Sequence, residues 1–389
     1  MIGKSRELSL YIHIPFCKRK CNYCDFCSFT SSADGLAERY ADALCADMLR
    51  YADAARGREV VTVYFGGGTP SLLEPSALER LLLCIRENFD LRRDAEITLE
   101  CNPATAREGF FEKIRGIGIN RLSIGLQSAN DGELAALGRL HSYGEFKETY
   151  FAARRAGFDN VSVDLMYGIP DQSIESFRHS LSEIVALSPE HISSYLLKIE
   201  EGTVFAARES ELALPDEDMQ FEMYSTMTNF LAENGYDKYE VSNFARTGFE
   251  SRHNVGYWTG REYLGFGVAA HSYFDGERFG NSRDLEAYLD GRDITEERER
   301  IDGRDAAFEF VMLGMRMGKG ISVDEYGRRF GRGFFEDFPS AERFERGGLV
   351  RLCNGRIAFT DEGFFVSNTV LAQFLEDFSK AVDKNAEML

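Results

Sequence analysis

Four cysteines fall within eleven residues, at positions 17, 21, 24 and 27, and they are the residues of this chain best suited to chemistry. The spacing Cys17-x3-Cys21-x2-Cys24 supplies three thiolates from one short segment. A cubane [4Fe-4S] cluster has four irons and usually takes four cysteines, so three thiolates leave one iron open to another chelator. The α-amino-carboxylate group of S-adenosylmethionine suits that vacancy. One electron from the cluster could then cleave a C–S bond and release a 5′-deoxyadenosyl radical.

A zinc site is the alternative for the same segment. Zinc would take the three thiolates with either Cys27 or His13 as its fourth ligand, in a zinc-stabilised binding protein. Zinc sites usually repeat a Cys-x2-Cys pair elsewhere in the sequence, and this chain has no second pair. The remaining cysteines stand singly, at positions 45, 84, 101 and 353. The spacing therefore favours the cluster.

The cysteine segment follows the first of six apolar or β-branched runs that alternate with helical patterns. We expect strands at Leu8–Ile14, Val60–Phe65, Glu96–Cys101, Arg121–Gln127, Val161–Tyr167 and His191–Leu197. Apolar residues at three- and four-residue steps predict helices at Leu36–Ala55, Pro75–Phe89, Tyr143–Ala156 and Ile174–Leu187. This alternation predicts an α/β fold with parallel strands and helical crossovers. Because six units fall short of a closed eight-stranded barrel, we expect an open or partial (β/α)6 barrel, with a doubly wound sheet as the alternative.

Polar residues follow the expected strands at the ends where ligands gather in such folds. Gly66-Gly67-Gly68-Thr69-Pro70 ends the second strand, and its glycines would let the backbone approach a ligand closely. Glu100 and Gln127 end the third and fourth strands, Asp164 lies in the fifth, and Arg139 follows the fourth. Each of these residues alone is weak evidence for a site, since a polar residue at a strand end is usually solvated or caps a helix. Together they predict a ring of polar side chains around one mouth, with the cysteine loop at its rim.

The pattern changes after about residue 235. We expect three parts: a core at 1–235, a sheet extension and linker at 236–304, and a C-terminal module at 305–389. Residues 236–270 predict strands and loops, and the charged segment 291–304 predicts a linker. In the module, Asn354-Gly355 between two alternating runs predicts a β-hairpin among helices, as in a winged helix. From Ser322 onward the module has nine Lys and Arg against twelve Asp and Glu, which favours a lid or docking surface over a DNA reader.

The composition narrows the possible partners. The 389 residues are 44% hydrophobic and carry a net charge of -19, which disfavours nucleic acid and anionic membranes as partners. No apolar run approaches the ~20 residues of a membrane span. Glu7 interrupts the N-terminal apolar stretch too early for a secretory signal. We therefore expect a cytoplasmic protein whose cysteines stay reduced.

The segment Tyr-Ile-His-Ile-Pro-Phe-Cys-x3-Cys-x-Tyr-Cys, starting at Tyr11, resembles the radical S-adenosylmethionine superfamily. Within it, the chain resembles the oxygen-independent coproporphyrinogen III oxidase group over essentially its whole length, and most of all the HemW-type haem chaperones. The resemblance implies a radical SAM partial barrel in which Cys17, Cys21 and Cys24 bind the cluster. It also implies a set of cofactor contacts, namely Tyr11, Tyr23, Gly67, Gly68, Thr69, Glu100, Gln127, Arg139 and Asp164. Arg139 would suit the cofactor carboxylate and Tyr23 its adenine.

Two features separate the haem chaperones from the oxidases. The oxidases have a further cysteine two residues after the third, where this chain has Phe26, with Cys27 one residue later. Residues His253-Asn254-Val255-Gly256-Tyr257-Trp258 resemble the His-Asn-x-x-Tyr-Trp signature of the chaperones. Imidazole is a common axial ligand of haem, and a phenol and an indole can flank a macrocycle. His253, Tyr257 and Trp258 are therefore candidate haem residues, with His271 as a second histidine.

We therefore expect a protein that binds a [4Fe-4S] cluster, S-adenosylmethionine and haem, and hands haem to acceptor proteins. The alternative is a coproporphyrinogen III oxidase that forms protoporphyrinogen IX by oxidative decarboxylation. For the His-Asn-x-x-Tyr-Trp motif, the simpler interpretation of the residues alone is that His253 hydrogen-bonds a loop while Trp258 fills a core gap. Lys18, Arg19 and Lys20 lie within the cysteine loop of an acidic protein, and they predict a docking point for an acidic electron donor such as a flavodoxin.

Overall fold

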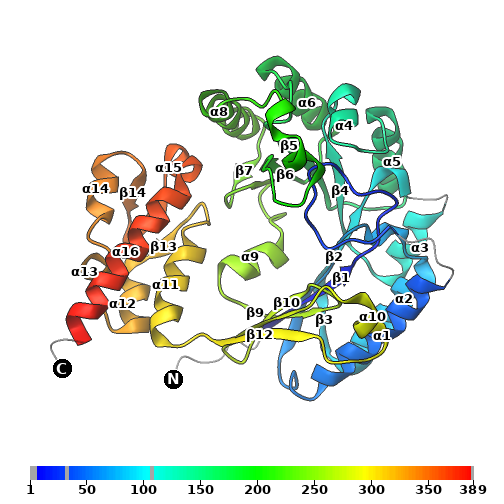
Figure 1. Ribbon diagram of the computed structural model, residues 1–389, viewed down its shortest axis with the longest axis horizontal. Coiled ribbons are helices and arrows are strands. Elements are labelled where there is room, and N and C mark those ends of the chain that lie inside the picture. The colour runs from blue at the N-terminus through cyan, green and yellow to red at the C-terminus, as the bar shows by residue number, and fades with distance from the viewer. Residues whose placement is uncertain (1–6, 31–34, 106–108, 387–389) are drawn as a thin grey trace.

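The computed structural model describes residues 7–30, 35–105 and 109–386. Within these residues, a twelve-stranded sheet has the order β12-β11-β10-β9-β1-β2-β3-β4-β5-β6-β8-β7, and a three-stranded sheet has the order β13-β15-β14. Strands β1 to β6 pair in parallel with their sequence neighbours, and helices cover their outer face (Figure 1). The expected α/β fold with a partial barrel of six units is confirmed. Residues 1–6, which were considered above for a secretory signal, lie outside the described residues.

The elements of the barrel lie close to their predicted positions. The parallel strands are β1 (Glu7–Ile14), β2 (Glu59–Gly67), β3 (Asp90–Cys101), β4 (Arg121–Gln127), β5 (Val161–Tyr167) and β6 (His191–Leu196). The principal helices are α1 (Leu36–Ala52), α2 (Pro75–Asn88), α3 (Phe110–Ile117), α4 (Asp131–Ala136), α5 (Tyr143–Arg155), α6 (Ile174–Leu187) and α8 (Glu217–Glu233). β3 begins six residues before its predicted start, because Asp90 and Leu91 pair with β2 ahead of an irregularity in register.

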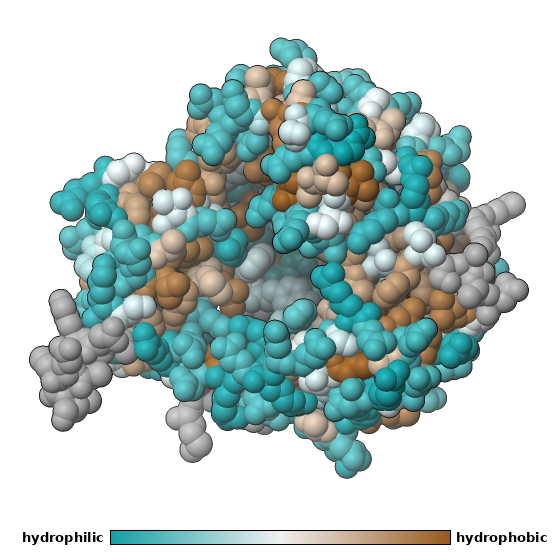
Figure 2. All heavy atoms as spheres, in the orientation of Figure 1, coloured by the Kyte–Doolittle hydropathy of each residue, from teal (hydrophilic) through white to brown (hydrophobic). Residues whose placement is uncertain are grey.

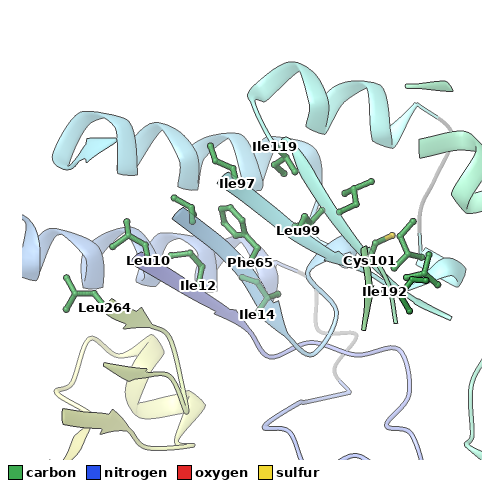
Figure 3. Packing of buried hydrophobic residues seen from close by; sticks show 14 of the residues in the cluster. Leu10, Ile12, Ile14, Phe65, Ile97, Leu99, Cys101, Ile119, Ile192 and Leu264 are labelled. Carbon is green, nitrogen blue, oxygen red and sulfur yellow. The ribbon is translucent and has the colours of Figure 1, made fainter. Parts of the chain in front are cut away.

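Strict alternation along the strands separates an apolar outer face from a polar interior. In β1, Leu8, Leu10, Ile12 and Ile14 are fully buried and belong to the apolar core. Figure 3 shows Leu10, Ile12 and Ile14 in this core. The intervening residues of β1 are Ser9, Tyr11 and His13. Side chains in a strand point alternately to its two faces, so this second set points into the barrel. The corresponding interior positions of β2 to β6 are also largely polar, namely Thr62, Tyr64, Glu96, Thr98, Glu100, Arg121, Ser123, Ser162, Asp164, His191, Ser193 and Tyr195.

The sheet continues beyond β1 as an extension. Its strands are β9 (Glu262–Phe266), parallel to β1, then β10 (His271–Phe274), β11 (Glu277–Asn281) and β12 (Thr295–Arg300) in antiparallel pairing. At the other edge lie β8 (Asn243–Ala245) and β7 (Asp237–Lys238). The linker expected at 291–304 was wrong in part, because β12 pairs with β11 there. Its sequence Thr-Glu-Glu-Arg-Glu-Arg is that of a charged edge strand, which resists pairing with other chains.

Residues 236–270 were expected to form strands and loops, but they also contain the helix α9 (Arg252–Trp258). Its first turn is capped twice. Ser251 accepts a hydrogen bond from the Asn254 amide, and the Glu96 carboxylate of β3 accepts bonds from the Arg252 and His253 amides at 3.0 and 3.1 Å. Because Thr62 lies in the first half of β2 and pairs in register with Glu96 of β3, α9 packs against the barrel on the amino-terminal side of the cofactor-cavity residues Tyr64 and Glu100.

The C-terminal module consists of helices around the small sheet. Its elements are α11 (Gly303–Gly314), β13 (Ile321–Ser322), α12 (Val323–Phe330), α13 (Phe334–Asp337), α14 (Ala341–Arg346), β14 (Val350–Cys353), β15 (Arg356–Phe359), α15 (Asp361–Phe365) and α16 (Ser367–Ala386). The predicted hairpin is confirmed, with Asn354 and Gly355 at φ 51° and 71° between antiparallel strands. Two ion pairs tie the module to the large sheet. Lys238 of the edge strand β7 pairs with Asp361, and Arg278 of β11, next to the opposite edge strand, forms a two-point pair with Glu309. In the part of the chain that is described, no helix is long and apolar enough to cross a membrane.

Candidate cofactor site

A cavity of about 350 Å³ lies at the carboxyl ends of the parallel strands. The molecule is hollowed near its centre in the space-filling view (Figure 2). Eight of the nine predicted cofactor contacts line this cavity, namely Tyr23, Gly67, Gly68, Thr69, Glu100, Gln127, Arg139 and Asp164. Tyr11 is the ninth and is not among the lining residues. Its hydroxyl lies 3.0 Å from His13 Nδ1, and its ring stacks on Tyr64.

The cysteine loop runs from Pro15 to Phe29 across the mouth of this cavity and is anchored to the turn after α4. Asn22 donates from its backbone to the Leu137 carbonyl at 3.0 Å and from its side chain to the Ala136 carbonyl at 2.9 Å. Arg19 donates to the carbonyls of Gly138 and Arg139. At its base the loop closes on itself, because Phe29 N donates to Pro15 O and Cys17 N to Phe29 O. Backbone and side-chain bonds from a distant turn therefore hold the loop in place.

The turn after β2 needs glycines because other parts of the chain approach its backbone closely. A Cβ at Gly68 would lie 2.7 Å from the Phe16 carbonyl oxygen, and one at Gly67 would lie 2.6 Å from the His13 ring, where φ is also 109°. Contacts that short would force the backbone apart, so only glycine fits between β2 and the cysteine loop. The turn is thus packed directly against the segment that carries the thiols.

Cys17, Cys21 and Cys24 are free thiols around the rim of the cavity. Cys17 Sγ lies 3.5 Å from Thr69 Oγ1, and Arg139 Nη1 donates to Cys21 Sγ at 3.6 Å. Burial, with a smaller contribution from the sulfurs of the other two cysteines, raises the pKa of Cys24 to about 11. A bound metal centre would reverse that shift, since a coordinating thiol is held as the thiolate. The three thiols along the rim thus fit a bound group that contains several metal ions.

Neither residue suggested as a fourth zinc ligand joins these thiols. Cys27 is buried in the apolar core, 8% exposed. Both ring nitrogens of His13 are engaged, with Tyr11 Oη and with the Cys27 carbonyl, each at 3.0 Å. Among the described residues, no group of three or more His, Cys, Asp or Glu side chains is arranged around a single metal ion.

Two carboxylates line the wall of the cavity below the thiols. Glu100 accepts hydrogen bonds from Tyr64 Oη at 2.8 Å and from the Gly67 amide at 3.2 Å. Burial, together with the nearby carboxyl of Asp164, raises the pKa of Glu100 to about 7. Asp164 accepts from Ser123 Oγ at 2.9 Å, and burial likewise raises its pKa. A buried carboxyl that ionises near neutral pH can bind a cationic or hydroxyl-bearing ligand in its carboxylate form.

Arg121 and Asn254 also line the cavity and were not singled out from the sequence. Arg121 opens β4 and is 2% exposed, and its Nε has no hydrogen-bond partner among the described residues. In the sequence, Arg121 could have been recognised as a charged residue at the start of an apolar strand, at a position whose side chain points into the barrel. Asn254 comes from α9 and enters the cavity from below, and only the tertiary structure brings it there.

The candidate haem residues do not share one site. His253 is 1% exposed, and its ring nitrogens lie 2.8 Å from Thr62 Oγ1 and 3.0 Å from Tyr257 Oη. Burial lowers its pKa to about 3, so it stays neutral. Both ring nitrogens of His253 are therefore hydrogen-bonded, although their partners lie in β2 and α9 rather than in a loop. Tyr257 and Trp258 face a different cavity, while His271 is exposed on β10.

The three basic residues of the cysteine loop are exposed. Arg19 nevertheless holds the loop to the turn at 138–139 through its guanidinium. Lys18 and Lys20 flank Arg19 in the sequence and are exposed beside the rim thiols.

Comparison with known proteins agrees with this geometry. The profile of the radical SAM superfamily matches residues 11–184, and that of the HemN C-terminal domain matches residues 301–366. Proteins named heme chaperone HemW are 35% identical in Lactococcus lactis, over 95% of this chain and 97% of theirs, and 35% identical in Escherichia coli, over 96% and 100%. The solved structure of the radical SAM enzyme coproporphyrinogen III oxidase HemN from Escherichia coli superposes with a TM-score of 0.83 at 26% identity, covering 95% of this chain and 90% of that one. The chain therefore belongs to the HemW family within the radical SAM superfamily.

Proposed function

We propose that this protein is a haem chaperone that carries a [4Fe-4S] cluster and S-adenosylmethionine and passes haem to acceptor proteins. The observation that carries this proposal is the similarity to proteins named as haem chaperones over nearly the full length of both chains. That similarity spans the cysteine loop, α9 and the C-terminal module. We also propose a cytoplasmic location, supported by eight cysteines that are all free thiols.

In this proposal the rim thiols hold the cluster, and the cavity holds the methionine-derived cofactor. Arg139 would bind the cofactor carboxylate beside Cys21, and the backbone at Gly67 to Thr69 would receive its amino group. Glu100 and Asp164 would accept bonds from ammonium or hydroxyl groups deeper in the cavity, and Tyr23 would pack on the adenine. When bound, the cluster and cofactor supply one-electron chemistry at the sulfonium.

The second candidate function is coproporphyrinogen III oxidation, which the structural similarity to HemN favours. Two observations weigh against it. Phe26 is 62% exposed at the position where the oxidases have a fourth cysteine. The cavity of about 350 Å³ is near the lower end of the ~300–1,000 Å³ typical of small-ligand sites, which suits one cofactor but leaves little space for a porphyrinogen beside it.

The functional prediction is haem transfer without decarboxylation. Protein loaded with iron and sulfide under anoxic conditions should bind haem and lose it to an apo-acceptor, such as a haem-free b-type cytochrome, as followed by absorption spectra. The same preparation, given coproporphyrinogen III, reductant and S-adenosylmethionine, should form no protoporphyrinogen above a no-enzyme control. Sustained multiple-turnover formation of protoporphyrinogen would instead establish the oxidase.

The cluster prediction concerns the cysteines individually. Cys17→Ala, Cys21→Ala and Cys24→Ala should each lose the [4Fe-4S] signal, because each removes one iron ligand. Cys27→Ala is the matched control and should keep it, since Cys27 is packed in the core. Iron and sulfide assays with EPR of the reduced protein measure both. A cluster that survives in Cys21→Ala but not in Cys27→Ala would reassign the ligands.

The pH prediction follows from Glu100, whose pKa is raised to about 7 by burial. Its carboxylate forms as the pH rises through 7, so the affinity for the cationic cofactor should increase by up to roughly tenfold between pH 6 and 8. Glu100→Gln should abolish this dependence, whereas Glu112→Gln, on exposed α3, should keep it. Isothermal titration with S-adenosylmethionine at several pH values tests this, and an unchanged profile in Glu100→Gln would exclude Glu100 as the titrating group.

We propose that an acidic electron donor such as a flavodoxin docks on the cysteine loop, supported by the exposed Lys18 and Lys20 beside the rim thiols. Lys18→Glu combined with Lys20→Glu should slow cluster reduction by flavodoxin several-fold at low salt, and the difference should shrink at high salt. Lys113→Glu, on exposed α3, is the charge-matched control. Stopped-flow absorbance measures the rate, and equal rates for all three proteins at low salt would refute the docking point.

A further inference from the structure

A second and larger cavity, of about 1240 Å³, lies between α9, the sheet extension and the C-terminal module. Figure 1 shows α9 between the barrel strands and α11 of the module. The cavity is lined from the barrel side by Tyr257 and Trp258, from the extension by Tyr263 and Tyr273, and from the module by Phe310. Aromatic side chains from three parts of the chain thus face one space, which suits a flat apolar ligand.

The charge of this cavity is opposite to that of the whole protein. Eight of its lining residues are Lys or Arg and six are Asp or Glu, in a chain of net charge -19. Most of these cations form ion pairs, such as Arg278 with Glu309 and Arg261 with Glu7. Arg304 and Lys319 form no ion pair within the described part of the chain; Arg304 lies in the first turn of α11, and Lys319 follows the end of that helix. Among the described residues, these two cations have no ion-pair partner and could bind an anionic ligand in the cavity.

The two cavities differ in volume. The cofactor cavity has about 350 Å³, whereas the second has about 1240 Å³ and exceeds the ~300–1,000 Å³ of ordinary small-ligand sites. A tetrapyrrole is larger than S-adenosylmethionine and is flat, apolar and, through its propionates, doubly anionic. The larger aromatic cavity with its excess of cations matches each of these properties.

Helix α9 is the common wall of the two cavities. Asn254 lines the cofactor cavity, while Tyr257 and Trp258 line the larger one. Between them, His253 is hydrogen-bonded to Tyr257, and its ring lies 5.0 Å from that of Tyr64. Tyr64 in turn donates to Glu100 in the cofactor cavity. A buried chain of contacts thus runs from one cavity to the other.

We propose that this second cavity is the haem site, formed jointly by the sheet extension and the C-terminal module and separate from the cofactor cavity. Arg304 and Lys319 bind the propionates, and Tyr257 and Trp258 flank the macrocycle. No His or Cys lies among the described lining residues, so an axial ligand from this chain is a Tyr phenolate or the Met317 thioether, both known haem ligands. This assignment rests on the proposed haem function and deepens it.

The test uses full-length, cluster-loaded protein and a haem titration followed by absorption spectra. Ala306→Trp fills the cavity from α11 and should weaken haem binding at least tenfold, while Asp305→Trp, one residue away, exposed and outside the lining, should not. Arg304→Glu combined with Lys319→Glu should weaken it comparably without adding bulk to the core. All variants should bind S-adenosylmethionine as the wild type does, and His253→Ala should keep the spectrum of an unchanged axial ligand.

The outcomes distinguish a wrong haem site from a wrong function. Haem affinity that is unchanged in both Ala306→Trp and the double charge reversal would overturn the site while leaving the chaperone function intact. Haem that competes with S-adenosylmethionine in the wild type would also overturn it, by placing haem in the cofactor cavity. A wild type that binds no haem at all would refute the proposed function itself.

Discussion

The alternation of side chains along six parallel strands is the constraint on which the rest of the structure depends. Every second residue of β1 packs outward as an apolar side chain, and the residues between them point into the barrel. Neighbouring strands repeat this separation in register, so that Glu100 pairs with Ser123 and Gly125 with Asp164. The outer faces form the core that stabilises the barrel. The inner faces provide a polar cavity whose groups are satisfied largely by one another.

A polar interior is tolerated only where its members are paired. The His253 ring nitrogens, the Tyr64 hydroxyl and the Glu100 oxygens each have a partner, and this network links α9 to the glycine turn. The same network explains why His253, although it lies in a motif with a tryptophan, is a poor iron ligand. Releasing a nitrogen would leave Thr62 or Tyr257 without a partner in a dry environment, at a cost of about 1–3 kcal/mol.

The cysteine loop shows how a metal-binding segment is held in place by residues far along the chain. Asn22 and Arg19 bond to the turn at 136–139, and the glycines after β2 allow the backbone to pack against Phe16. The thiols are therefore positioned by the scaffold, although Cys24 is held as a neutral thiol by burial until a positive centre is present. Such preorganisation is what a site needs when its ligands come from a loop.

The sequence by itself determined the strands, the cysteine spacing and eight of the residues that line the cofactor cavity, because alternation and the positions of strand ends are local properties. Local patterns missed α9 and β12, since a seven-residue helix capped by Glu96 and a charged edge strand are stabilised by distant partners. They also could not separate His253 from Tyr257 and Trp258. Only the tertiary structure decided that these neighbours face different surroundings, because a helix turns about 100° at each residue and its environment on each side comes from other parts of the chain.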